Sequence, residues 1–184
     1  YFTSAGASQG EVVLAVNTLL MQLFTLFSYV MDGFAYAGEA LAGKYIGARN
    51  ETSLHRTVRQ IFAWGGGLAL LFVLLYGVGG EAFLSLLPDD CSVIAAADTY
   101  FYWALLIPVA GFAAFMWDGI YIGATATRGM LLSMFVASLL FFVIYLSGRA
   151  TYGNHALWGA FIVYLFSRGA VQTLLAPKVL RVMR

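Results

Sequence analysis

The sequence has 184 residues, of which 61% are hydrophobic and 10% are charged. Water-soluble domains are about 45–50% apolar and about 25% charged, so this composition excludes an ordinary soluble domain and indicates a membrane protein. The formal net charge of +1 excludes a strongly basic nucleic-acid-binding protein, and the single cysteine, Cys91, excludes a disulfide framework within the chain.

The chain starts at Tyr1 with a polar stretch that extends to Gly10. No basic segment, short apolar run or cleavage site of a signal peptide precedes this stretch. We therefore expect the sequence to be an internal-to-C-terminal piece of a longer protein.

Five apolar stretches follow, each of a length that suits a membrane-spanning helix, which needs about 20 apolar residues. They cover residues 12–43, 58–78, 99–127, 130–146 and 156–176. Polar breaks are expected at 47–51, 87–90, 128–129 and 147–154, and Pro177 is expected to end the fifth helix because proline disrupts a helix interior. The runs are too continuous for the alternating strands of a membrane barrel. The predicted fold is an all-α integral membrane bundle with five transmembrane helices.

Positive charges predict the orientation, because cytoplasmic loops retain Lys and Arg. These residues lie between the first and second spans, between the third and fourth, and after the fifth: Lys44, Arg49, Arg56, Arg59, Arg128, Lys178, Arg181 and Arg184. The other side carries Arg149 and the acids Glu11, Glu81, Asp89, Asp90 and Asp98. We expect the N-terminus and Cys91 outside the cell and the C-terminus in the cytoplasm.

The first span has a polar side chain or glycine at alternating intervals of four and three residues, which places the set on one helix face. The set is Thr18, Gln22, Thr25, Tyr29, Asp32, Tyr36, Glu39 and Gly43. Such a face can be a seam that joins helices through hydrogen bonds. A charged residue in a bilayer costs at least ~2.5 kcal/mol, however, which also makes Asp32 and Glu39 functional candidates. We predict that this face turns toward other helices or a cavity and away from lipid.

The third span is apolar until Asp118, which Tyr121 and Thr125 follow on nearly the same face. Pro108, ten residues earlier, should free one backbone carbonyl and kink the helix. Asp118 is interpreted either as an acid satisfied by a neighbouring helix or as part of an ion or substrate pathway. The GxxxG pattern from Gly119 to Gly123 should let another helix approach closely.

Arg168 in the fifth span is expected to reach the cytoplasmic interface or to pair with an acid. No nucleophile elbow, phosphate-binding loop or metal-ligand spacing occurs in the sequence. We therefore predict that the protein is not an enzyme and has no cofactor.

Two segments carry a resemblance to a known family. Residues 31–50, MDGFAYAGEALAGKYIGARN, strongly resemble the end of the eighth helix and the following loop of multidrug and toxic compound extrusion (MATE) transporters. Residues 118–125, DGIYIGAT, resemble that family's tenth helix. The likeness is greatest to the branch named for the DNA-damage-inducible protein F, and it covers essentially residues 1–184 as helices 8–12 of twelve.

The resemblance implies a secondary exporter with two six-helix lobes around a central cavity. Such a protein would move organic cations, drugs and other amphipathic compounds out of the cell while H⁺ or Na⁺ enters. The chain would then be part of the C-terminal lobe, without helix 7 and the N-terminal lobe, in the cell inner membrane. Its partners would be small substrates, lipid and the missing lobe, with no nucleic acid.

Asp118 matches the position of an ion-coupling acid on that family's tenth helix, so a Na⁺ ion near it is possible. The aromatic residue expected one turn earlier is replaced here by Ala114. The candidate ion-coupling and cavity residues are Asp118, Asp32, Glu39, Tyr121, Tyr36, Gln22 and Tyr29. The alternative function is a flippase for lipid-linked sugars, which would need cationic cavity residues, and Arg168 is the one candidate for that role.

Overall fold

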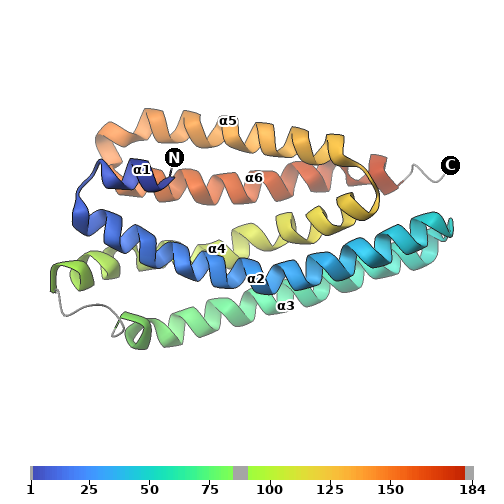
Figure 1. Ribbon diagram of the computed structural model, residues 1–184, viewed down its shortest axis with the longest axis horizontal. Coiled ribbons are helices and arrows are strands. Elements are labelled where there is room, and N and C mark those ends of the chain that lie inside the picture. The colour runs from blue at the N-terminus through green and yellow to red at the C-terminus, as the bar shows by residue number, and fades with distance from the viewer. Residues whose placement is uncertain (1, 85–90, 181–184) are drawn as a thin grey trace.

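A computed structural model describes residues 2–84 and 91–180. It describes their side chains except at residues 81–84 and 91–95. In these ranges the chain forms helices joined by short turns and contains no strand (Figure 1). The helices are α1 (Phe2–Ala7), α2 (Glu11–Gly47), α3 (Glu51–Leu84), α4 (Cys91–Gly123), α5 (Thr127–Tyr152) and α6 (Asn154–Leu180).

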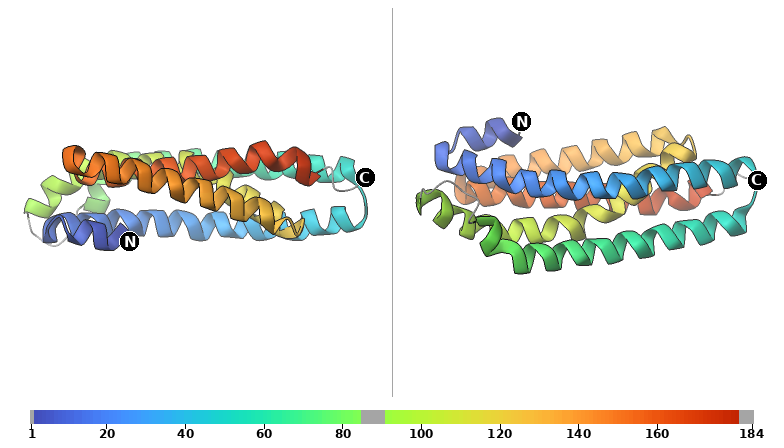
Figure 2. Two further views of the ribbon diagram at one scale, coloured as in Figure 1. Left: turned by 90° about the horizontal axis from the view of Figure 1, so that it is seen from above. Right: turned by 60° about the horizontal axis from the view of Figure 1, so that its bottom comes forward.

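The five long helices lie lengthwise side by side, and α1 is a short segment folded back at one end (Figures 1 and 2). Helices α2, α4 and α6 run in one direction, while α3 and α5 return in the opposite direction. Each of the five contains a stretch long and apolar enough to cross a membrane. The predicted all-α bundle of five spans is therefore confirmed.

Several predicted boundaries were wrong. The third span ends at Gly123 rather than at residue 127, because Thr125 adopts a left-handed backbone with φ of 54° and stops the helix. The break falls at residues 124–126, and residues 128–129 belong to α5. Helix α5 likewise continues through the predicted break at 147–149 and ends at Tyr152, where Gly153 has φ of 50°.

Pro108 and Pro177 are both accommodated inside helices. Pro177 does not end α6, which continues to Leu180. A proline this close to the end of a helix removes one backbone hydrogen bond and leaves few residues beyond it to disrupt. Helix α4 is also continuous across Pro108.

Helices α2 and α4 pack backbone against backbone, and the GxxxG pattern is the reason. A Cβ atom added at Gly119 would lie 2.0 Å from the carbonyl oxygen of Ala35, and one at Gly123 would lie 2.3 Å from that of Glu39. Only glycine can therefore occupy these positions at this helix separation. The contact confirms the predicted close approach and places α2 directly beside Asp118.

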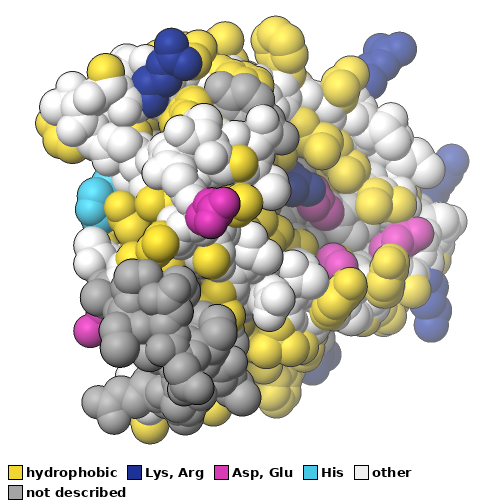
Figure 3. Space-filling view, turned by 60° about the vertical axis from the view of Figure 1, so that its left-hand side comes forward, with side chains coloured by type: hydrophobic (Ala, Val, Ile, Leu, Met, Phe, Trp, Pro, Cys, Tyr) yellow, Lys and Arg dark blue, Asp and Glu magenta, His cyan; other side chains and the backbone are white. Residues whose placement is uncertain are grey.

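The core lies between α2, α3, α4 and α6. Phe27 on α2 is fully buried and packs edge-on against Phe72 on α3, at 5.4 Å between ring centroids, and Phe115 on α4, at 5.8 Å. Helix α5 packs mainly on α6 and exposes large apolar side chains, among them Leu131, Phe135 and Leu139. Hydrophobic side chains are spread over the face seen in Figure 3, and many large ones are exposed, as expected of a lipid-exposed bundle.

Basic side chains gather mainly at one end of the molecule, which is the far, right-hand end in Figure 3. This end holds the α2–α3 turn, the α4–α5 turn and the end of α6.

Among the charges used to predict the orientation, Asp89, Asp90, Arg181 and Arg184 lie outside the described residues, as do the predicted break at 87–90 and the side chains of Glu81 and Cys91.

Candidate functional site

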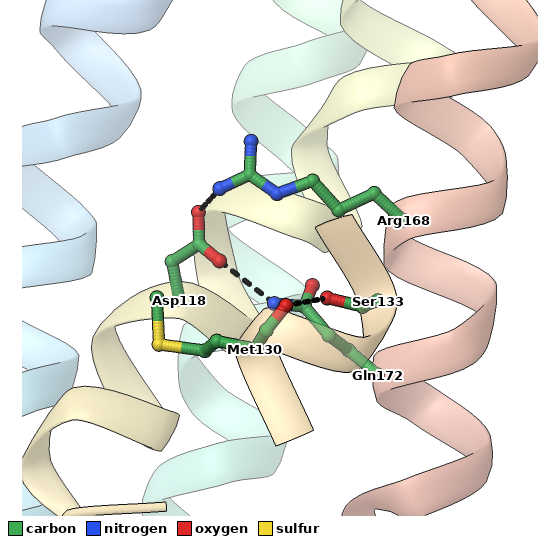
Figure 4. Close-up of polar contacts among 5 residues, drawn as sticks. All are labelled: Asp118, Met130, Ser133, Arg168 and Gln172. Carbon is green, nitrogen blue, oxygen red and sulfur yellow. Dashed lines mark hydrogen bonds and ion pairs between the residues drawn. The ribbon is translucent and has the colours of Figure 1, made fainter. Parts of the chain in front are cut away.

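Asp118 on α4 meets two polar side chains of α6 (Figure 4). Arg168 and Gln172 are four residues apart and therefore project from the same side of that helix. Nη2 of Arg168 donates to Oδ2 of Asp118 in an ion pair, and Nε2 of Gln172 donates to Oδ1 at 2.7 Å. The side chains of the ion pair are only about 15% exposed. The chain thus supplies its own counter-ion for this acid.

This arrangement decides between the two predictions for Arg168, which pairs with an acid rather than extending alone to the interface. It also shows that a neighbouring helix supplies partners for Asp118, which was the first of the two interpretations of this acid. Gln172 was missed by the sequence analysis, although a polar residue one turn after a membrane arginine could have indicated a shared acceptor.

Two further hydrogen bonds join α4 to α6 around the ion pair. Nε1 of Trp117 donates to Oγ1 of Thr173 at 2.8 Å, and the hydroxyl of Tyr121 donates to the backbone carbonyl of Gln172 at 2.6 Å. Tyr121 is fully buried and packs edge-on against Trp117. Tyr121 therefore positions α6 and lies in the helix interface, without access to an open cavity.

The hydrogen bonding of the site is incomplete. Nε of Arg168 and Oε1 of Gln172 are buried, and neither has a hydrogen-bond partner. Unsatisfied buried polar atoms are rare in native proteins and often mark functional sites. The unused amide oxygen, next to a carboxylate, could accept a hydrogen bond from a protonated acid or contribute an oxygen ligand to a small cation.

Asp32 and Glu39 on α2 are both half-buried. The contact of Gly119 with Ala35 holds α2 against α4, and Asp32 precedes Ala35 by about one helical turn. This part of the bundle therefore combines the acids Asp32, Glu39 and Asp118 with a single paired base, Arg168.

The rest of the polar face of α2 is open. Tyr29 and Tyr36 are 72% and 69% exposed, and Gln22 and Thr25 are also exposed. The hydroxyl of Thr25 donates to the carbonyl of Met21 in its own helix. Gly43, the last member of the face, lies against Gly123 of α4, whereas most buried side chains of α2 lie on the opposite side of the helix.

A different polar contact between helices was missed. The amides of Asn17 on α2 and Asn154 at the start of α6 donate to each other at 2.8 and 2.9 Å, and Nε1 of Trp158 donates to Oδ1 of Asn17 at 2.8 Å. All three side chains are buried. Asn17 lies one position from the predicted polar face, and its amide within an apolar run was the available signal.

The residues that the structure describes include no cluster of three or more His, Cys, Asp or Glu side chains that could hold a metal ion. The candidate residues fall into a charged centre between α4 and α6, two acids of α2 beside it, and the exposed face of α2.

Comparison with known proteins adds family relationships. Residues 2–146 match the family model MatE. The chain is 40% identical over 167 residues to DNA damage-inducible protein F of Escherichia coli K12. This aligned region covers 91% of this chain and 36% of that protein. It is 21% identical over 168 residues to Protein DETOXIFICATION 42 of Arabidopsis thaliana, covering 91% of this chain and 33% of that protein. The chain thus spans about a third of the length of these curated relatives.

Proposed function

Because the chain belongs to the MatE family, the multidrug and toxic compound extrusion (MATE) transporters, we propose that it forms part of a secondary exporter of organic cations and drugs. The five apolar helices and the family make it a multi-pass membrane protein. In our proposal it is the larger part of a C-terminal lobe, in the inner membrane, with its C-terminus in the cytoplasm. Outward movement of substrate is driven by entry of H⁺ or Na⁺.

The observation that carries the proposal is the ion pair of Asp118 with Arg168, most of which is withdrawn from solvent. A buried ion pair contributes little net stability, because desolvation offsets much of the attraction between the charges. A proton or Na⁺ that neutralises Asp118 would leave Arg168 without its counter-ion. The contact between α4 and α6 would then weaken, which is a way to couple ion binding to helix movement.

The polar face of α2 supports a role in substrate binding. Its acids, Asp32 and Glu39, can attract a cation, and the exposed rings of Tyr29 and Tyr36 can contact it through their π faces. Gln22 adds a neutral hydrogen-bonding group about two turns before Tyr29 on the same face. In our proposal this face lines a cavity completed by the missing lobe.

The alternative function, flipping of lipid-linked sugars, has less support. A pyrophosphate headgroup requires unpaired cationic residues. Arg168, the candidate for that role, already has Asp118 as its counter-ion. The acids near this centre outnumber its base, which favours a cationic substrate.

The family is one of transporters, which agrees with the prediction that the protein is not an enzyme.

The test is transport by the full-length protein in proteoliposomes with an imposed Na⁺ or pH gradient. We expect a gradient to drive transport of a fluorescent organic cation, and an ionophore that collapses the gradient to abolish it. Movement of a lipid-linked sugar without gradient-driven cation transport would contradict the proposal and favour the flippase.

A further inference from the structure

A cavity opens between the start of α5 and the end of α6. These helices share a tight turn at one end and diverge toward the other, as the left view of Figure 2 shows. The cavity has a volume of about 450 Å³ and is lined by residues 125–129, Leu132, Leu175, Lys178 and Val179. No residue of α2 or α3 contributes to it, so it is separate from the polar face considered above.

The lining of this cavity divides into a basic part and an apolar part. Arg128 and Lys178 supply two positive charges, and Thr125 and Thr127 supply hydroxyl groups. In the described part of the chain, none of these four side chains forms a hydrogen bond or ion pair with another residue. Apolar side chains complete the wall at Leu132, Leu175 and Val179.

The position of the cavity matches the level of lipid headgroups. Helix α5 has 26 residues and is therefore about 39 Å long, whereas the hydrocarbon core of a bilayer is about 30 Å thick. Its first turn carries Arg128 and precedes the apolar run at 130–146, so we place this turn in the headgroup region. The apolar wall along α5 and α6 continues from there toward the hydrocarbon core.

We propose that this cavity binds one anionic phospholipid. The headgroup phosphate lies between Arg128 and Lys178, and the threonine hydroxyls donate to its oxygens. The acyl chain lies along Leu132 and Leu175. Basic pockets between transmembrane helices suit phosphate headgroups, and two unpaired cations favour a lipid with net negative charge over a zwitterionic one. This proposal requires membrane insertion but does not depend on the transported substrate.

The test uses the full-length protein in nanodiscs that contain phosphatidylglycerol and phosphatidylcholine, with retained lipid counted by native mass spectrometry. The test variant is Arg128→Gln with Lys178→Gln. The matched control is Arg56→Gln with Arg59→Gln, which removes two exposed basic side chains at the same end of the bundle but outside the cavity. A charge-conserving variant, Arg128→Lys with Lys178→Arg, checks that folding is not the cause.

We expect the test variant to retain phosphatidylglycerol at least five-fold less than the wild type, while the control and the charge-conserving variants retain it normally. Inorganic phosphate should not displace the lipid. Equal losses in the test and control variants, equal retention of phosphatidylcholine, or displacement by inorganic phosphate would each overturn the proposal. The last result would indicate a site for free anions.

Discussion

At the scale of single residues, Asp118 and Arg168 are each other's main electrostatic partner. Removal of one charge leaves the other poorly solvated, whereas removal of both leaves no unpaired charge. The structural cost of changing Asp118 must therefore be separated from any effect on function. A double variant that also neutralises Arg168 achieves this.

We predict that Asp118→Asn lowers stability and that Arg168→Gln in the same chain restores most of it. Breaking a fully buried ion pair costs about 3–5 kcal/mol, and the residual exposure of this pair places the expected loss below that range. Thermal unfolding in detergent measures the effect. The exposed Asp98 on the same helix provides the control, Asp98→Asn. Equal unfolding temperatures for Asp118→Asn and Asp98→Asn would show that Arg168 is not destabilised by the loss of its counter-ion.

A second prediction concerns Asn17. Asn17→Ala removes the acceptor of Trp158 and both bonds to Asn154, so we expect a loss of about 1–3 kcal/mol from the buried groups left unpaired. The adjacent Thr18 is exposed and donates only to Leu14 in its own helix, so Thr18→Ala should change the unfolding temperature little. A Thr18→Ala loss as large as that of Asn17→Ala would contradict this assignment.

At the scale of helices, the contact between α2 and α4 depends on two glycines. We predict that Gly119→Ala strongly lowers the unfolding temperature, because the new Cβ would overlap the backbone of Ala35 and force the helices apart. Gly33→Ala is the matched control, since a Cβ there has no atom within 4 Å. A Gly119→Ala protein as stable as Gly33→Ala would mean that the two helices are not in close contact.

The number and the type of the membrane-spanning helices could be predicted from the sequence because each of them needs a long apolar run to cross the bilayer, whereas the short helix α1 lies in a stretch that is polar by sequence and was missed. Their ends could not be predicted as well. Thr125 is not a residue that usually adopts a left-handed backbone, and Pro177 is tolerated because it lies near a helix end.

The candidate site was only partly predictable for a related reason. Asp118 could be identified by its charge, but its pairing depends on how α4 and α6 are rotated, and its partner lies 50 residues further along the chain. The same applies to the pairing of Asn17 with Asn154. In contrast, the GxxxG contact was predictable because it requires only local spacing of small residues.

At the scale of the whole molecule, the exposed polar face of α2 is the surface that we propose lines the substrate cavity. We predict that it faces water in the full-length protein. In a Cys91→Ser background, Tyr29→Cys and Tyr36→Cys should react with a hydrophilic thiol reagent. Leu139→Cys, on the exposed apolar surface of α5, should not. Protection of both α2 positions together with labelling at Leu139→Cys would reverse the assignment of these surfaces.

The central claim is that Asp118 couples ion entry to export. Its most direct test is ion-driven uptake of a fluorescent cation in inverted vesicles that contain the full-length protein with both Asp118→Asn and Arg168→Gln. This variant leaves neither charge of the Asp118–Arg168 pair without its partner. Arg168→Gln alone and Asp32→Asn serve as comparisons. We predict that uptake is lost in the double variant at wild-type protein level and stability, while Asp32→Asn retains more uptake. Wild-type uptake by the double variant would show that Asp118 is structural and that coupling occurs elsewhere in the protein.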